Sequence, residues 1–135
     1  RAIKQAVSIP VVANGDITSV EKAEYVLNYT GADAIMVGRG AQGRPWIFRE
    51  INHFLKTGTQ LSAPSLDEIG AILIGHVKEL HTFYGDYMGV RIARKHVSWY
   101  MQQHDQEKTF RSAFNSFETI DEQLGSLNLY FDNLT

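Results

Sequence analysis

Two short glycine-containing turns, each placed directly after an apolar run, constrain this sequence more than any other feature. The segments 9–17 (IPVVANGDI) and 34–43 (AIMVGRGAQG) both begin like buried strands and end in a glycine turn. A helix-like pattern follows each of them. Gly15 and Gly38 are 23 positions apart, about the length of one strand–helix–strand crossover. The sequence therefore predicts two parallel strands joined by a right-handed connection.

The two turns can bind a phosphate group if their strands are neighbours. Adjacent strands lie about 4.8 Å apart, so both turns then share one edge of the sheet. Glycine lets the backbone approach a bound group closely, and amides at helix N-termini are free donors with a positive dipole end. In a (β/α)₈ barrel this is the position of the phosphate site after strands 7 and 8. Two ordinary strand–helix turns are the alternative interpretation, and Arg39 in the second turn favours the phosphate site.

The first third of the sequence is α/β in character. Thr18 and Glu21 fit a capping box that begins a helix, and Gly31 is placed to end it. Pro45 suits the first turn of the next helix, which Gly58 closes. Two strands, predicted over 8–14 and 34–37, cannot be buried on both faces by themselves. We therefore expect residues 1–58 to belong to a larger sheet or barrel, most of which lies upstream of a sequence that begins without Met.

The remainder of the sequence is predicted to be helical. Residues 59–64 are polar, contain a proline and are interpreted as a linker. Ser65 and Glu68 fit a second capping box, and the apolar spacing that follows continues to Gly85. Three further helices are expected over 90–103, 107–115 and 117–131. The prediction for 65–135 is therefore a small antiparallel four-helix bundle.

Charge and composition exclude several kinds of site. The sequence has 13 basic and 15 acidic residues, so its net charge identifies no partner, and it has no cysteine. Disulfides, thiolate metal sites and a cysteine nucleophile are thus excluded within these 135 residues. The histidines lack carboxylates at useful spacing, so no metal site is expected. No apolar run approaches the roughly 20 residues that span a membrane, and no signal peptide is visible, so we expect a cytoplasmic protein.

One predicted helix carries a basic face. Arg91, Arg94 and Lys95 have the i, i+3, i+4 spacing that places them together, opposite the apolar stripe. Such a face can follow the phosphates of a nucleic acid, although a solvated helix surface has the same pattern. Trp99 lies near the edge of this face, where it either stacks on a base or packs. His96 is expected on the apolar side as a structural residue.

The located motifs resemble a known family. Residues 9–17 and 31–46 (GADAIMVGRGAQGRPW) look like the last two strand–helix units of the bacterial tRNA-dihydrouridine synthases. Residues 89–100 (GVRIARKHVSWY) resemble the C-terminal helical domain of that family, and the likeness is closest to its B-type subfamily. It covers essentially the whole chain. The segment 38–46 is specific to the family, whereas 14–16 (NGD) recurs in other flavin barrels.

The resemblance implies a flavin-binding (β/α)₈ barrel followed by a four-helix domain. Such an enzyme uses FMN, reduced by NADPH, to saturate the C5–C6 bond of particular uridines in tRNA. The residues that match the FMN segments of the family are Asn14, Gly15, Asp16, Gly38 and Arg39. Because a carboxylate repels a phosphate, we expect Asp16 to point away, to the ribityl hydroxyls, to an arginine or into a helix cap.

The resemblance also favours tRNA contacts on the basic face, through Arg91, Arg94 and Lys95. The catalytic cysteine of the family has no counterpart in this sequence, so we expect no catalytic residue and no activity from the chain alone. The intact protein is expected to be monomeric, and the chain to associate or swap through its exposed strand edges. Two alternatives stay open: a stand-alone tRNA-docking helical module, and a different FMN-dependent barrel oxidoreductase that acts on a small metabolite.

Overall fold

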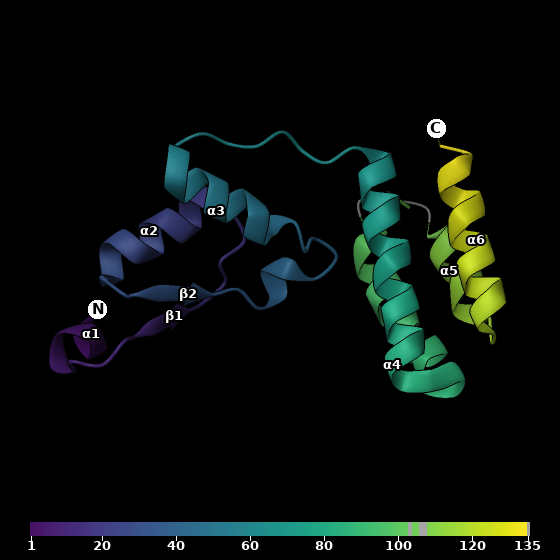
Figure 1. Cartoon of the computed structure of the whole chain (residues 1–135), viewed down its shortest axis with the longest axis horizontal. Helices are drawn as coiled ribbons and strands as arrows, with labels where there is room; N and C mark the ends of the chain where they lie inside the picture. The colour runs from purple at the N-terminus through teal and green to yellow at the C-terminus, as the bar shows by residue number, and fades with distance from the viewer. Residues whose placement is uncertain (103, 106–107, 135) are drawn as a thin grey trace. The chain divides into compact units, whose positions relative to one another are not determined.

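The structure is a computed structural model that describes residues 1–102, 104–105 and 108–134 (Figure 1). The chain divides into two units, Arg1–Ser62 and Ala63–Thr135. The first contains a two-stranded parallel sheet with helices, and the second is helical. Among the described residues, no helix has both the length and the apolar character required to cross a membrane.

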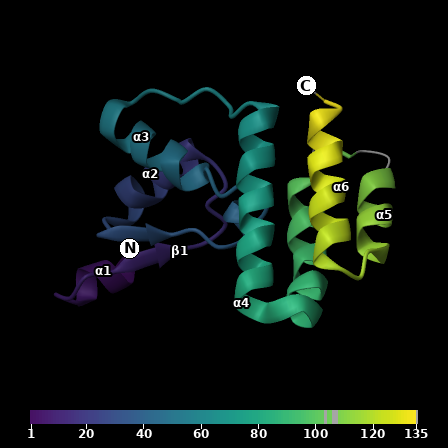
Figure 2. The ribbon, with the colours of Figure 1, turned by 45° about the vertical axis from the view of Figure 1, so that its right-hand side comes forward.

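The first unit alternates helices and strands. In chain order its elements are α1 (Ala2–Ala6), β1 (Val12–Asn14), α2 (Val20–Thr30), β2 (Ala34–Met36), the 3₁₀ turn η1 (Arg39–Ala41) and α3 (Ile47–Thr57). β1 and β2 pair in parallel with Val12 opposite Ala34 and Asn14 opposite Met36, and Figure 2 shows them side by side. The prediction of two parallel, neighbouring strands is confirmed.

β1 is shorter than the predicted 8–14. Before it, the Val11 carbonyl still accepts from the Asp33 amide at 2.9 Å, but the Val11 amide bonds to a side chain. Pro10 has no N–H to donate. The amide of Val11 donates to the Asp33 carboxylate at 2.7 Å, and Lys4 Nζ reaches the same oxygen at 2.6 Å. These hydrogen bonds lower the pKa of Asp33, with the one from Lys4 contributing most. Regular pairing therefore begins only at Val12.

The cap of α2 corrects one sequence prediction. The N-cap is Ser19, not Thr18: the Ser19 hydroxyl accepts a hydrogen bond from the Lys22 amide at 3.1 Å, and its backbone is extended. Both residues are good caps, so propensity could not choose between them. The choice is made by tertiary contacts, because the Thr18 carbonyl accepts from Arg44 at 3.3 Å. The predicted C-cap at Gly31 is confirmed by its left-handed φ of 69°.

The helices of the first unit bury a small apolar core. α2 packs against both strands and against α3. The buried core residues are Ile17, Val20, Ala23, Ile47 and Ile51. Contrary to the sequence prediction, Pro45 does not lie in the first turn of α3, because α3 begins at Ile47 and its N-cap is Trp46. The predicted C-cap at Gly58 is confirmed by its left-handed φ of 71°.

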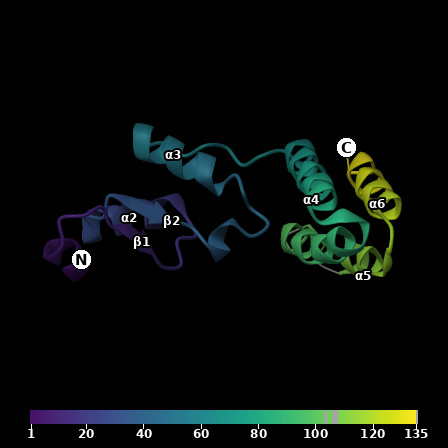
Figure 3. The ribbon, with the colours of Figure 1, turned by 60° about the horizontal axis from the view of Figure 1, so that its bottom comes forward.

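The second unit is built around one long, bent helix. α4 (Leu66–Tyr100) is interrupted at Gly85, whose φ of 72° and ψ of 179° are not helical. The chain reverses there, so α4 consists of a first arm and a second arm, and the predicted end at Gly85 is confirmed. α5 (Thr109–Ser116) and α6 (Ile120–Asp132) follow on one side of the folded-back α4 (Figures 2 and 3). The predicted boundaries at 103 and 107 lie outside the described residues.

Close backbone packing and one buried polar link hold these helices together. A Cβ on Gly89 would lie 2.9 Å from the His81 Cα, so the two arms approach to a distance that only glycine permits. The side chain of Gln123 donates to the Val90 carbonyl at 3.0 Å and accepts from His81 Nε2 at 2.9 Å. Gln123 on α6 thereby joins both arms. The apolar core around this link contains Leu73, Val77, Ala93, Val97, Phe114 and Leu127.

Candidate functional site

The two glycine turns lie at the same edge of the sheet. Asn14 and Met36 are opposite each other as the last paired residues, so Gly15 and Gly38 follow at the carboxyl ends of adjacent strands. The chain bends sharply after β1, where Gly15 has a φ of 151° and Asp16 a φ of 41°. Glycine tolerates such a conformation, whereas an L side chain at Gly15 would be strained.

Three glycines in these turns have two different surroundings. A Cβ on Gly40 would lie 2.3 Å from the Ile17 carbonyl oxygen, so the second turn packs directly on the backbone of the first. At Gly15 and Gly38, by contrast, a Cβ would meet no atom within 4 Å. Gly40 therefore brings the two turns together, and Gly15 and Gly38 border open space.

An ion pair bridges the two turns. Arg39 Nη2 lies 2.5 Å from Asp16 Oδ1, and the two side chains are 80% and 74% exposed. Pairing with an arginine is one of the three arrangements expected for Asp16. An exposed pair contributes only about 0–1 kcal/mol to stability, so it can open or share its cation with a ligand at small cost.

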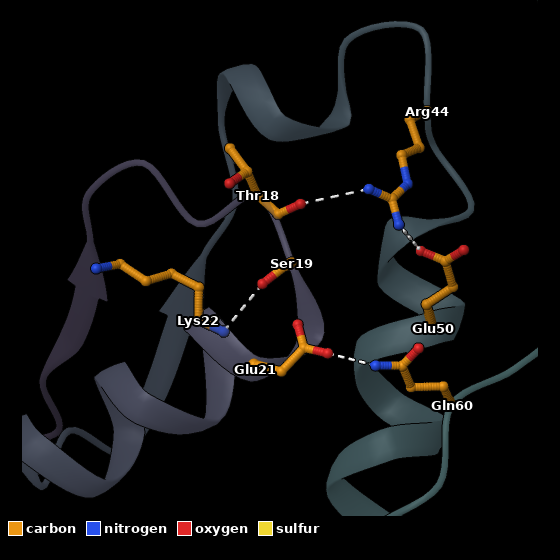
Figure 4. Close-up of polar contacts among 7 residues, drawn as sticks. All are labelled: Thr18, Ser19, Glu21, Lys22, Arg44, Glu50 and Gln60. Carbon is orange, nitrogen blue, oxygen red and sulfur yellow. Dashed lines mark hydrogen bonds and ion pairs between the residues drawn. The ribbon is translucent and has the colours of Figure 1, made fainter.

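A second set of polar contacts fixes the first turn and the start of α2 against α3 (Figure 4). Arg44 donates to the Thr18 carbonyl at 3.3 Å and to Glu50 Oε2 at 2.5 Å, and Glu50 is only 8% exposed. The Gln60 amide donates to the Glu21 carboxylate. Hydrogen bonds from its own backbone amide, then from the Ser19 hydroxyl, lower the pKa of Glu21.

Sequence reasoning missed this Arg44–Glu50 pair. The two residues are six apart and joined through a turn that precedes α3, a spacing that no periodic pattern marks. The pair orients the 43–46 segment, and with it the turn that contains Gly38 and Arg39. It is thus part of the support of the candidate site.

On the helical unit, the three predicted basic residues do not act as one set. Arg91 and Lys95 are exposed, whereas Arg94 is half-buried and donates to the Phe117 carbonyl at 2.8 Å. Arg94 is thereby directed towards the junction between α5 and α6. The Arg91 guanidinium lies 5.2 Å from the centre of the Tyr87 ring and donates to its hydroxyl at 3.1 Å.

Lys95 lies at one end of a row of rings between the two arms of α4. Its Nζ is 4.9 Å from the centre of the Trp99 ring, which meets the edge of His96 at 5.0 Å. His96 in turn lies 4.8 Å from His76, and these two residues are called the histidine pair below. Burial lowers the pKa of both, and the neighbouring His76 and Lys95 lower that of His96 further.

The histidine pair is also tied to a buried tyrosine. His76 Nδ1 lies 3.2 Å from the Tyr100 hydroxyl, and burial raises the pKa of Tyr100 to about 12. These rings are therefore neutral at pH 7. Within the described part of the chain, no cluster of three His, Asp or Glu side chains is arranged to hold a metal ion.

Proteins of one known family match this chain over its whole length. The family model described as "Dihydrouridine synthase (Dus)" matches residues 1–135. A protein of Vibrio cholerae named tRNA-dihydrouridine synthase B is 62% identical over 134 residues, which are 99% of this chain and 42% of that protein. A protein of the same name from Serratia marcescens is 60% identical over 135 residues, 100% of this chain and 40% of its own length. The chain thus spans about two fifths of the curated relatives that it matches.

Proposed function

Because this chain belongs to the dihydrouridine synthase family, we propose that it is the C-terminal part of a flavin-dependent tRNA-dihydrouridine synthase. The whole enzyme reduces the C5–C6 bond of particular uridines in cytoplasmic tRNA. The observation that carries the flavin assignment is the position of Gly15 and Gly38 at the ends of adjacent parallel strands. Exposed apolar residues in and just before the strands support a longer barrel, since Ile9, Val12 and Met36 are more than half exposed in this chain.

The residues of the two turns hold the FMN phosphate in this proposal. Gly15 and Gly38 border open space, so a ligand can approach their backbone closely. Arg39 supplies a positive charge, which Asp16 keeps in position before the phosphate arrives. Asn14, the last residue of β1, lies at the same edge and offers an amide side chain. Bound FMN supplies hydride to the uracil ring and regains it from NADPH, and this chain binds and orients the cofactor.

The direct test is the flavin content and product of the full-length enzyme that contains this sequence. We expect a yellow protein with FMN bound, and dihydrouridine in tRNA after incubation with NADPH. Gly38→Ala adds a methyl group where the protein leaves space, so it should lose flavin without losing its fold. Gly125→Ala, on α6 and equally free of neighbours, is the matched control and should keep its flavin. A colourless wild-type protein without dihydrouridine product contradicts the proposal.

The helical unit docks the tRNA in this proposal. Arg91 and Lys95 have exposed cations that can contact phosphates. Arg94, the third residue of the predicted basic face, contributes less because its half-buried guanidinium is bonded to the Phe117 carbonyl. Loss of a phosphate contact lowers affinity for all tRNA sequences alike and reduces the slope of log K against log salt by about 1. Arg91→Ala and Lys95→Ala should show both effects. Binding that does not depend on salt argues against a phosphate-contacting surface.

A further inference from the structure

The second arm of α4 has two pairs of an exposed cation and an aromatic ring, of which Tyr87 is exposed and Trp99 half-buried. The pairs are Tyr87 with Arg91, and Trp99 with Lys95. The members of each pair are four residues apart and are therefore neighbours on the helix surface. The surroundings of the two rings differ, and this difference decides which ring can meet a nucleobase.

Acidic residues line a cavity beside Tyr87. Tyr87 lines a shallow cavity of about 540 Å³ together with Asp86, Glu118 and Asp121. Acidic side chains beside Tyr87 disfavour a nucleobase stacked on its ring, because they repel the phosphates next to that base. The exposed Arg91 guanidinium can still reach a phosphate away from this cavity. The ring of Tyr87 therefore serves to hold the Arg91 guanidinium.

The Trp99 end has no such acidic rim among the contacts of the described residues. The indole meets Lys95 on its face and His96 at its edge, and His96 is backed by His76. The ring is thus held from one side by a neutral, half-buried histidine pair and covered by a long, exposed and flexible cation. A ring fixed in this way keeps its orientation when the lysine moves.

We propose that Trp99 is a stacking platform for an unpaired nucleobase of the tRNA, and that Lys95 moves from the indole to a neighbouring phosphate when the RNA binds. This inference rests on the proposed tRNA-docking function of the helical unit and adds a base contact to it. An exposed ammonium binds an aromatic ring weakly, whereas a nucleobase stacks on it more strongly, so the exchange favours the complex. Lys95 keeps a partner throughout, first the ring and then the phosphate.

The test follows indole fluorescence and affinity in the same titration. The chain has two tryptophans, so Trp46→Phe leaves Trp99 as the only emitter. Unmodified transcript tRNA is added to this variant, and affinity is measured in parallel by filter binding. We expect saturable quenching with the same midpoint as binding. A fully paired, blunt RNA duplex should bind more weakly and quench less, because its bases have no free faces.

Three substitutions define the contact. Trp99→Leu should weaken tRNA binding about tenfold, within the range measured when a stacking side chain is removed, and Trp99→Phe should restore most of it. Phe83→Leu is the matched control, since this ring is 81% exposed on the same helix and its described contact is with Tyr84. It should bind like the wild type. Thermal melting of each variant verifies that the helical unit is folded.

The outcomes distinguish the stacking role of Trp99 from the proposed tRNA-docking function of the helical unit. If tRNA binding depends on Lys95 but Trp99→Leu binds normally and no quenching occurs, the stacking platform is wrong and the phosphate surface stands. An equal loss for Phe83→Leu and Trp99→Leu also overturns the platform, because it reveals a general effect of removing exposed rings. If the wild-type chain binds no tRNA, both the platform and the docking surface are overturned.

Discussion

Gly40→Ala is the substitution that most sharply tests how the two glycine turns are held together. The added Cβ would lie 2.3 Å from the Ile17 carbonyl oxygen and 3.3 Å from its carbon. To restore an ordinary contact, the two backbones must separate by about 1 Å, and neither atom belongs to a side chain that can rotate away. Overpacking typically costs about 1–3 kcal/mol, and we expect the upper part of that range, about 2–3 kcal/mol, because backbone must move.

The assay uses urea unfolding of the chain in a Trp99→Phe background, in which Trp46 alone reports on the first unit. Gly40→Ala should lower the free energy of unfolding of this unit by about 2–3 kcal/mol. Gly38→Ala is the control for steric contact, because a Cβ there meets nothing within 4 Å, and its loss should be smaller than that of Gly40→Ala. If the two variants are equally stable, the turns do not pack as described.

Three further predictions concern both units. In the second unit, Gly75→Ala should stabilise the protein by about 0.5–1 kcal/mol, since the added Cβ meets no atom within 4 Å and alanine favours helix. Gly89→Ala should destabilise it by about 1–3 kcal/mol, because the added Cβ would lie 2.9 Å from the His81 Cα. Chemical denaturation of both variants measures the two free energies of unfolding. Burial lowers the pKa of both histidines of the pair below 6.5, so the unfolded state takes up protons before the folded state does. The free energy of unfolding should therefore be highest above about pH 6.5 and fall as the pH drops towards 5. His96→Phe should show a flatter dependence of stability on pH. Arg44→Ala leaves the buried Glu50 carboxylate without its cation and should lower the free energy of unfolding by about 2 kcal/mol, a value reduced for the exposure of the arginine. The double variant with Glu50→Leu should regain part of this loss, and a double-mutant cycle measures the coupling between the two residues.

The predictable part of the fold was the part encoded by local pattern. Crossover length and two apolar runs were enough to predict that β1 and β2 are parallel neighbours, because that geometry has few solutions. Gly31, Gly58 and Gly85 were predicted as helix ends, since a left-handed residue there requires glycine or a close substitute.

The errors and omissions arose where tertiary contacts choose between locally equivalent residues. Thr18 and Ser19 are both good N-caps, and the bond from Arg44 to the Thr18 carbonyl decides between them. Periodicity placed Arg94 on the basic face, yet its guanidinium turns to the Phe117 carbonyl, an acceptor 23 residues away. Helical spacing fixes the direction of the Cα–Cβ bond but not the end of a long side chain.

At the candidate site, sequence could identify the glycines but not their separate roles. The sequence analysis assigned Gly38 to the FMN segments and gave Gly40, two residues later, no role of its own. Only the structure separates Gly38, which borders open space, from Gly40, which meets the Ile17 carbonyl. The pairing of Asp16 with Arg39 was one of several open possibilities until the two turns were placed next to each other.

The central claim is that the turns at Gly15 and Gly38 hold one flavin phosphate, and the affinities of FMN and riboflavin test it most directly. The two flavins differ only by that phosphate, so the apo form of the full-length enzyme should bind FMN far more tightly. In Gly38→Ala the affinity for FMN should fall towards that for riboflavin, while riboflavin binding stays nearly unchanged. A Gly38→Ala enzyme that keeps the wild-type preference for FMN, or loses both flavins equally, would contradict the account.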